Sequence, residues 1–348
     1  MKRSPKTKSS IFLRACAGEI MNPPPVWIMR QAGRILKPYQ DLKNRVGSIE
    51  TLFNTPELAA EVTIMPVHML GVDAAILFAD IFTPIAPMGC EFRFQPGPVL
   101  SCPIRSRSAV NTLRTINAEE DLPHVDETIR LVRSELPAEI PLIGFAGAPI
   151  TLATYLTEGS GKRDFTQFLR LLNSEPETTK LLLDKLTEVA ISYLKMQIAA
   201  GAEAIQLFDT WIGQLSYKQF EDVALPYLQR IFSELTEMQV PTIYYTNNSG
   251  HLLPLLPQTG AKVFSLDWRV SITHARQLLG PTCPIQGNLD PYTLFATHDT
   301  INQATAELLN ETCGTPHIVN LGHGVHPETP IDSVRTMIAA VRGLQKQI

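Results

Sequence analysis

The chain has 348 residues, of which 44% are hydrophobic and 18% are charged, and its formal net charge is -4 with a pI near 6.1. This composition excludes an intrinsically disordered chain, and the lack of an overall positive charge argues against a nucleic-acid partner. No run of about 18 uninterrupted apolar residues occurs, so we expect no membrane span.

The N-terminal segment MKRSPKTKSS is basic and polar, and the short apolar run after it is interrupted by Arg14. We expect residues 1–18 to form a flexible tail and not a signal peptide, and residues 19–348 to form one catalytic domain. The cysteines are odd in number and form no C-x-x-C pair (Cys16, Cys90, Cys102, Cys283, Cys313). This pattern favours a reducing, cytoplasmic location and argues against a disulfide framework or a structural zinc site.

Short apolar runs then recur along the chain, at 26–29, 74–79, 141–146, 204–208, 242–246, 262–266, 283–287 and 317–321. Most do not alternate with polar residues, which is typical of parallel strands buried on both faces. Helix-like segments lie between them. One spans 55–70, with Thr55 as N-cap and Pro56 at the first helical position, and another spans 174–201 and ends at Gly201.

Three of these units share one pattern, a glycine that ends a helix and a short strand that finishes in an aspartate: Gly71 with Asp80, Gly201 with Asp209, and Gly260 with Asp267. Eight strand–helix units in this length predict an α/β fold, a single TIM (β/α)8 barrel. A doubly wound nucleotide-binding sheet is disfavoured, since no G-x-G-x-x-G turn is present. Residues 91–105, around Pro96-Gly97, predict a β-hairpin insertion.

In such a barrel, the residues that follow each strand face the active site. This rule selects Arg30, Arg34, Asp80, the GFAGAP turn at 144–149, the segment 208–210, Asp267, Asn288, Asp290 and His323. Two arginines and a histidine among several carboxylates suit a polyanionic substrate that also carries hydrogen-bond donors.

Structural interpretations compete with this one. An arginine pair at i, i+4 is most often a solvated helix face, and strand-end aspartates such as Asp267 and Asp290 often cap the next helix. Tyr155 has the setting of a packing aromatic residue. Three other histidines look structural or exposed: His68, His274 and His298. His323 lies between two glycines in Asn320-Leu-Gly-His-Gly, a pattern that allows close backbone approach but that also occurs in phosphate-binding turns.

Two catalytic classes lack their required residues. A serine hydrolase would need the G-x-S-x-G nucleophile elbow, which is absent. A zinc enzyme would need a Cys/His ligand set, but His251 lies in GHLLP with no cysteine nearby, so no metal site is expected.

The same residues carry a family resemblance. The segments PVWIMRQAGR (25–34), FAD (78–80), GFAGAPITLATYLTEGSG (144–161), QLFDTWIGQLS (206–216), SGHLLPLL (249–256), LDW (266–268), QGNLDP (286–291) and NLGHGVHPETP (320–330) together resemble the uroporphyrinogen decarboxylases of haem biosynthesis. The resemblance covers about residues 20 to 340. It implies a homodimeric TIM barrel that needs neither metal nor organic cofactor and that converts the four acetates of uroporphyrinogen III into methyl groups, giving coproporphyrinogen III.

The resemblance also implies roles for individual residues. Asp80 matches the family's central aspartate, which accepts hydrogen bonds from pyrrole N–H groups and stabilises a protonated pyrrole that acts as the electron sink. Arg30 is a candidate proton donor, with a bound water as the alternative. The remaining implied contacts are carboxylate ligands (Arg30, Arg34, Tyr155, Thr210, His323), apolar walls (Phe145, Phe208) and neighbours in the first motif (Met29, Gln31).

Three departures from the family pattern fall at the cleft edges: Thr210 in place of a common serine, Ile35-Leu-Lys37-Pro after Arg34, and the segment Tyr244-Tyr245-Thr246-Asn247-Asn248. The main alternative is a corrinoid-linked methyltransferase of the same superfamily. It would require a zinc-binding H-x-C motif at His251, where this chain has Leu253 in place of the cysteine. A non-catalytic tetrapyrrole-binding barrel would lack Arg30, Arg34 or Asp80, and all three are present.

Overall fold

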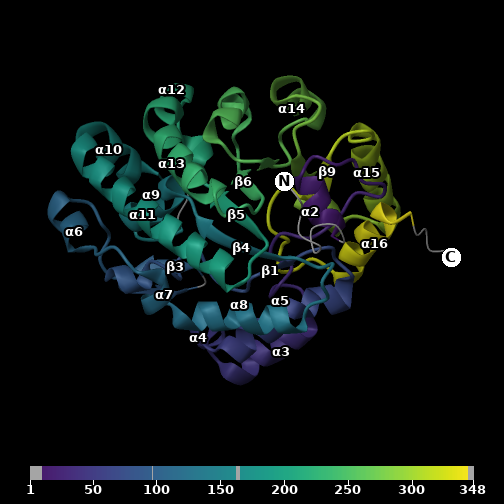
Figure 1. Ribbon diagram of the computed structural model, residues 1–348, viewed down its shortest axis with the longest axis horizontal. Helices are drawn as coiled ribbons and strands as arrows, with labels where there is room; N and C mark the ends of the chain where they lie inside the picture. Colours follow the sequence, from purple (N-terminus) through teal and green to yellow (C-terminus); the bar gives the residue numbers. More distant parts are fainter. Residues whose placement is uncertain (1–9, 96, 162–164, 344–348) are drawn as a thin grey trace.

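A computed structural model describes residues 10–95, 97–161 and 165–343 (Figure 1). Its main sheet contains seven parallel strands, each paired with the next along the chain. In order across the sheet they are β1 (Ala75–Ile76), β4 (Leu142–Gly147), β5 (Ala204–Asp209), β6 (Thr242–Thr246), β7 (Val263–Ser265), β8 (Ile285–Leu289) and β9 (His317–Leu321). Seven of the eight predicted strands are therefore confirmed, and most of their ends differ from the prediction by no more than two residues. Within the predicted strand 74–79, only Ala75 and Ile76 form the strand β1.

The segment around Val26 closes the sheet between β9 and β1. Val26 forms an isolated parallel bridge with Val319, and its carbonyl accepts a hydrogen bond from the Asp73 amide at 2.8 Å. The Trp27 amide donates to the Val319 carbonyl of β9 at 3.3 Å, but three other amides of this segment donate to side chains: Val26 to Asp73, Ile28 to Gln31 and Met29 to Asn320. The predicted strand at 26–29 is thus reduced to a single bridge, but it takes the eighth position of a TIM barrel.

Helices surround the sheet (Figure 1). They are α2 (Ile11–Cys16), α3 (Lys37–Val46), α4 (Ile49–Asn54), α5 (Pro56–Leu70), η1 (Ala86–Met88), α6 (Arg107–Thr112), α7 (Ala118–Asp121), α8 (Pro123–Glu135), α9 (Pro149–Glu158), α10 (Thr166–Ser174), α11 (Pro176–Ala200), η2 (Ile212–Gln214), α12 (Tyr217–Gln219), η3 (Phe220–Ala224), α13 (Leu225–Thr236), η4 (Gly250–Thr259), α14 (Ile272–Leu279), η5 (Pro291–Phe295), α15 (His298–Glu311) and α16 (Ile331–Val341). Many neighbouring helices pack on one another, including α5 on α8, α8 on α11, α11 on α13, and α16 on both α15 and α5.

The helix boundaries follow the local signals in the sequence. Helix α5 begins at Pro56 and ends before Gly71, and α11 ends before Gly201, as predicted. Thr55 precedes α5, but its hydroxyl donates to the Thr51 carbonyl at 2.8 Å and does not cap the helix. The hydrophobic core lies between these helices and the sheet. No helix in the described part of the chain is long and apolar enough to cross a membrane.

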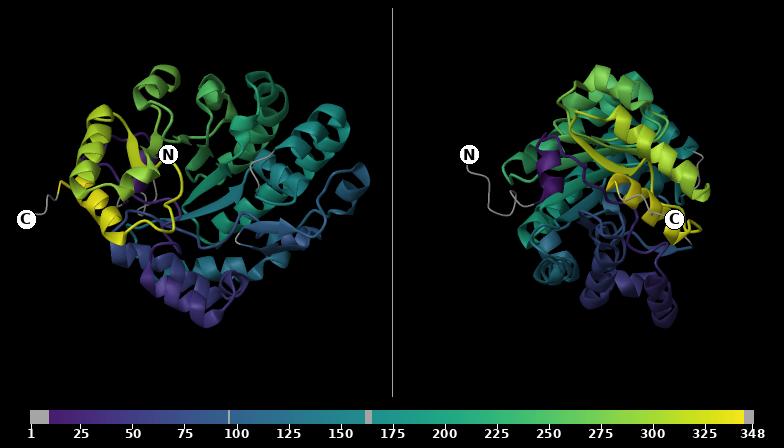
Figure 2. Two further views of the ribbon diagram at one scale, coloured as in Figure 1. Left: turned by 180° about the vertical axis from the view of Figure 1, so that it is seen from behind. Right: turned by 90° about the vertical axis from the view of Figure 1, so that its right-hand side faces the viewer.

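The predicted hairpin is present as strands β2 (Phe92–Phe94) and β3 (Pro98–Leu100), which pair antiparallel. Pro96 of the predicted turn lies outside the described residues. Helices α3 and α4 lie together at one edge of the molecule, and α4 packs against α5 (Figure 2).

The N-terminal prediction was wrong in part. Residues 1–9 lie outside the described residues, but Ile11–Cys16 form helix α2, which packs against β9. The Ser10 side chain accepts a hydrogen bond from the Leu13 amide, and Phe12 and Ala15 are fully buried. Burial of this apolar face outweighs the polarity of the preceding segment, so the predicted boundary at residue 18 is too far along the chain.

Candidate active site

The carboxyl ends of the barrel strands surround a cavity of about 800 Å³. Parallel strands bring the residues that follow them to this one end, as predicted. Most of the residues selected from the sequence line the cavity: Met29, Arg30, Arg34, Asp80, Phe145, Tyr155, Phe208, Thr210 and His323. Gln31 does not, because it is fully buried and its amide binds the Ile28 N–H and the Ala74 carbonyl.

Arg30 is held in an unusual backbone conformation at the edge of this cavity. Its φ of 65° lies in the left-handed region, which costs a non-glycine residue roughly 1–2 kcal/mol. Its side-chain stem passes directly over Gly324, where a Cβ atom would lie 2.3 Å from the Arg30 Cδ. Strain of this kind is characteristic of functional sites, and here it fixes where the guanidinium enters the cavity.

Arg34 adds a second positive charge to the cavity, near that of Arg30. Burial and the nearby charge of Arg30 lower the pKa of Arg34 to about 10, and its guanidinium donates to the Val325 carbonyl at 3.3 Å. All ion pairs between described residues lie elsewhere, so neither arginine has a carboxylate partner within the described protein. Two guanidinium groups in this state are suited to bind carboxylates from a ligand.

Asp80 contributes a carboxylate to the same cavity. It sits in a tight turn in which its Oδ1 accepts the Phe82 amide at 2.9 Å and its carbonyl accepts the Thr83 amide at 3.0 Å. Burial raises the pKa of Asp80, although the Phe82 N–H and the charge of Arg30 act in the opposite direction. The turn therefore holds one carboxylate oxygen in place. Because desolvation disfavours the ionised carboxylate, a cation or N–H donors from a ligand would stabilise it.

Aromatic side chains form much of the remaining wall. Phe145 and Phe208 pack edge to face with ring centroids 5.4 Å apart, and Phe208 lies 5.6 Å from Tyr245. Tyr155 packs edge to face on Phe82 with ring centroids 5.4 Å apart. Burial raises the pKa of the Tyr155 hydroxyl, while the charge of Arg30 lowers it and the charge of Asp80 raises it. Tyr155 is thus both a packing residue and a polar group of the cavity.

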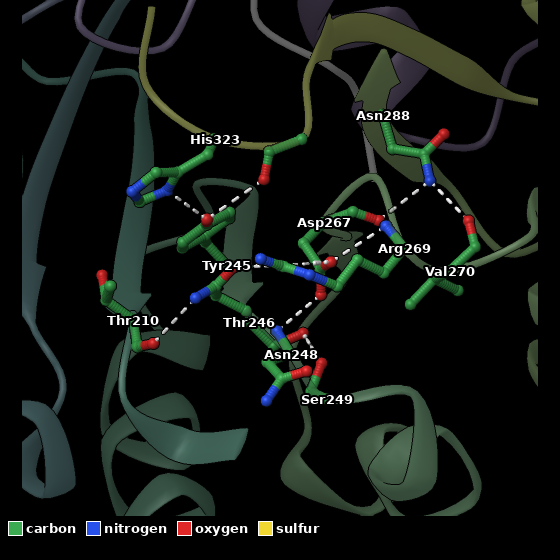
Figure 3. A network of polar contacts seen from close by, with 12 residues as sticks. Thr210, Tyr245, Thr246, Asn248, Ser249, Asp267, Arg269, Val270, Asn288 and His323 are labelled. Carbon is green, nitrogen blue, oxygen red and sulfur yellow. Dashed lines mark hydrogen bonds and ion pairs between the residues drawn. The ribbon is translucent and has the colours of Figure 1, made fainter. Parts of the chain in front are cut away.

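His323 enters the cavity from the segment after β9 and contacts Tyr245 on β6 (Figure 3). Its Nδ1 lies 2.7 Å from the Tyr245 hydroxyl oxygen, and the two rings are stacked with centroids 6.1 Å apart. Tyr245 is fully buried and lines the cavity, but it was not among the predicted site residues. Its only signal was the unusual double tyrosine of the strand.

The glycines beside His323 are explained by packing. A Cβ at Gly322 would lie 2.2 Å from the backbone nitrogen of Trp268, and one at Gly324 would collide with Arg30. The pattern that also allowed a phosphate-binding turn therefore reflects the close passage of two neighbouring segments.

Other strand-end residues have structural roles. The buried Asp267 carboxylate accepts the Asn248 and Arg269 amides, at 2.6 and 3.0 Å, and Asp290 caps η5 through the Tyr292 amide (Figure 3 shows the Asp267 contacts). Asn288 donates to the carbonyls of Asp267 and Val270. The capping interpretation is confirmed for Asp290 but is wrong for Asp267, because the next helix, α14, is capped by the Ser271 side chain. The exposed positions of His68, His274 and His298 agree with the prediction that these histidines are structural or exposed.

Asp209 lies beneath the cavity wall. The hydroxyls of Thr151 and Tyr244 donate to its two oxygens at 2.6 and 2.7 Å. Burial nevertheless raises the pKa of Asp209 to about 6. It is therefore a structural acid behind Phe208 and not a substrate contact.

A zinc centre at His251 has no support from its surroundings. The His251 Nε2 lies 2.8 Å from the Leu215 carbonyl, and Leu253 is fully buried among apolar residues. Within the described residues, no three His, Cys, Asp or Glu side chains are grouped so that they could hold a metal ion.

Comparisons with known proteins agree with this geometry. The model of the uroporphyrinogen decarboxylase (URO-D) family matches residues 7–344. The uroporphyrinogen decarboxylase of Trichlorobacter lovleyi is 46% identical over 97% of this chain and 99% of its own length, and that of Carboxydothermus hydrogenoformans is 46% identical over 96% of both.

Among solved structures, a methyltransferase from Methanosarcina mazei superposes with a TM-score of 0.77 at 20% identity, covering 96% of this chain and 98% of its own. A B12-independent methionine synthase from Shewanella sp. W3-18-1 gives a TM-score of 0.54 at 12% identity, covering 85% of this chain and 88% of its own. At these identities the likeness supports the barrel fold alone.

Proposed function

Because this chain belongs to the uroporphyrinogen decarboxylase family, we propose that its cavity binds uroporphyrinogen III and converts the four acetate side chains into methyl groups, giving coproporphyrinogen III. The chain is a carboxy-lyase of porphyrin biosynthesis. The observation that carries the site assignment is one half-buried aspartate, Asp80, which lines a cavity that also holds two arginines without carboxylate partners among the described residues.

Substrate binding follows from the charges of this cavity. The substrate carries eight carboxylates, and Arg30 and Arg34 can each make fork-shaped, charge-assisted hydrogen bonds worth roughly 1.5–3 kcal/mol. A lysine has no such planar fork, so it cannot replace this geometry. His323, Tyr155 and the Thr210 hydroxyl supply further polar contacts, while Met29, Phe145 and Phe208 contact the pyrrole faces.

Asp80 supplies the electrostatic part of the reaction. Protonation of a pyrrole ring carbon gives an iminium-like cation, which accepts the electron pair released when the acetate C–C bond breaks and CO2 leaves. The carboxylate of Asp80 stabilises that cation and accepts hydrogen bonds from the pyrrole N–H groups, an effect of charges placed before the reaction begins. The protein groups invoked here require neither a metal nor an organic cofactor.

Two sources of the proton are consistent with the cavity: Arg30 and a water molecule. An ordinary guanidinium gives up its proton only above about pH 12, which makes arginine a weak general acid. Replacement of Arg30 by lysine keeps a cation, and replacement by glutamine removes it. If Arg30 only binds substrate, the two variants should share the wild-type solvent isotope effect on kcat, and a changed isotope effect would make it the donor.

The methyltransferase alternative gains only the fold likeness. It needs a bound metal, and the residues around His251 provide a backbone carbonyl and a buried leucine. One equivalent of zinc in the purified protein would revive it.

We also propose a homodimer in the cytoplasm and a single catalytic domain that includes helix α2. All five cysteines are free thiols, which supports a reducing compartment. Light scattering during size-exclusion chromatography measures the mass, and a monomeric mass at micromolar concentration would contradict the dimer.

The activity test is anaerobic incubation with uroporphyrinogen III and no added cofactor, followed by oxidation and chromatography. We expect porphyrins with seven to four carboxylates to accumulate. An unchanged octacarboxylate would refute the assignment.

A further inference from the structure

Tyr245 links the side chain of His323 to the backbone beside it. Its hydroxyl oxygen lies 2.7 Å from the His323 Nδ1 and 3.1 Å from the Gly322 carbonyl oxygen (Figure 3). Tyr245 is fully buried within β6, so this hydroxyl cannot turn to solvent. The other ring nitrogen of His323, Nε2, points away from Tyr245, and the ring lines the cavity.

The two contacts fix the direction of the hydrogen bonds. A tyrosine hydroxyl has one proton, and a carbonyl can only accept. If the hydroxyl donates to Gly322, its oxygen accepts from a proton on Nδ1 of His323. The reverse arrangement would leave the carbonyl of the buried Gly322 without this donor, which is unfavourable.

The surrounding groups keep the hydroxyl protonated. Burial and the charge of Asp267 raise the pKa of Tyr245, and Arg30 and Arg269 lower it by less. Next to His323 in the chain, the Arg30 stem covers Gly324, and the Trp268 ring centroid lies 6.3 Å from that of the His323 ring. The other imidazole of this segment, His326, contacts the Phe295 ring at 5.5 Å.

We propose that Tyr245 is a positioning residue that keeps the proton of neutral His323 on Nδ1, so that His323 binds a substrate carboxylate through Nε2 only after it takes up a proton. With Nδ1 already protonated, Nε2 of the neutral ring carries a lone pair, which repels a carboxylate. The imidazolium carries N–H groups on both sides and binds Tyr245 and the carboxylate together. This inference rests on the proposed function, because it takes the substrate carboxylate as the ligand of His323.

The KM for uroporphyrinogen III between pH 6.5 and 8.5 tests the proposal. In the wild type, KM should rise by up to about tenfold per pH unit in the upper part of this range, because the binding-competent fraction falls with the imidazolium. In Tyr245→Phe the neutral ring is free to carry its proton on Nε2 and to donate to the carboxylate. Its KM should therefore rise less than about threefold over the whole range. Equal slopes in the two proteins would overturn the proposal.

Control variants separate this effect from general damage. Tyr244→Phe removes a buried hydroxyl from the same strand, one that donates to Asp209, and should keep the wild-type slope. His323→Gln places a permanently neutral donor near the Nε2 position and should lose the slope. If Tyr244→Phe also loses the slope, or His323→Gln keeps it, the slope does not come from the Tyr245–His323 pair and the proposal fails.

A measurement on the wild type without substrate depends neither on whether Tyr245→Phe folds nor on the proposed function. Nitrogen-15 NMR of histidine-labelled wild type at pH 8.5, assigned with His323→Gln, should show the neutral ring of His323 protonated on Nδ1. A proton on Nε2 would contradict the inference. A wild type that shows this tautomer but does not decarboxylate uroporphyrinogen would refute the proposed function alone.

Discussion

Replacement of Asp80 by asparagine separates its charge from its shape. The amide oxygen of asparagine can still accept the Phe82 amide, which the carboxylate binds at 2.9 Å, so the turn should persist. What disappears is the negative charge that we propose stabilises the protonated pyrrole. Removal of one preorganised electrostatic group typically costs about 10²–10³ in kcat, or roughly 2.7–4 kcal/mol, and we expect a loss in this range.

The same change should leave stability equal or higher. Burial raises the pKa of Asp80 above its ordinary value, so folding favours the neutral carboxyl group. The ionised form therefore costs stability at pH 7, and this cost disappears as the pH falls below the ordinary value. Because asparagine does not ionise, the variant should unfold at or above the wild-type temperature while turnover falls, as expected where stability is given up for activity.

The assay is the anaerobic time course of product porphyrins, paired with thermal unfolding of each protein. Asp80→Ala is the matched comparison, since it loses both the charge and the acceptor for Phe82. It should lose about 1 kcal/mol of stability, or roughly 1–3 °C, in addition to activity. An asparagine variant that keeps more than a tenth of the wild-type kcat would refute the electrostatic role of Asp80.

Three further changes probe the surroundings of this group. Gly324→Ala should lower kcat/KM at least tenfold with little effect on unfolding, because the new Cβ would displace the Arg30 side chain. Gly322→Ala should instead destabilise the fold, because its Cβ would lie 2.2 Å from a backbone nitrogen. Measurement of both activity and melting temperature distinguishes the two variants. Arg34→Lys should lower kcat/KM about tenfold or more, equivalent to about 1.4 kcal/mol, since one bidentate contact is lost, and an unchanged KM and kcat would remove Arg34 from the site. Asp209→Asn should alter the pH dependence of stability. Because burial raises the pKa of Asp209 to about 6, its ionisation costs the wild type roughly 3 kcal/mol of stability as the pH rises from about 4 to about 7. Urea unfolding should therefore show the variant gaining this amount of stability relative to the wild type over that pH interval.

The residues that follow buried strands were predictable because chain direction alone determines which end of a parallel barrel they reach. Arg30, Asp80 and His323 meet in one cavity for this reason, although 50 positions separate Arg30 from Asp80 and 243 positions separate Asp80 from His323. Local signals likewise predicted where α5 and α11 begin and end. Neither inference required knowledge of side-chain packing.

The errors arose where packing decides. Gln31 follows an arginine of the cavity, but its side chain turns inward to bind backbone groups of its own segment and of the next strand. Tyr245 stood out only as part of an unusual segment and not as a site residue, because strand periodicity does not reveal which positions near the carboxyl end reach the cavity. The apolar face of α2 was too short to recognise as a helix until its contact with β9 was known.

The side-chain bonding of the segment at 26–29 makes it unusually sensitive to inherited change. A ladder of backbone hydrogen bonds persists when side chains are exchanged, but here three of the amides depend on Asp73, Gln31 and Asn320. Two of those partners lie 47 and 291 positions away in the chain. A single codon change at Asp73 or Asn320 would therefore loosen the segment that carries Arg30 without altering any group in the cavity. Loss-of-function alleles should accumulate at these buried positions as well as at the arginines they support.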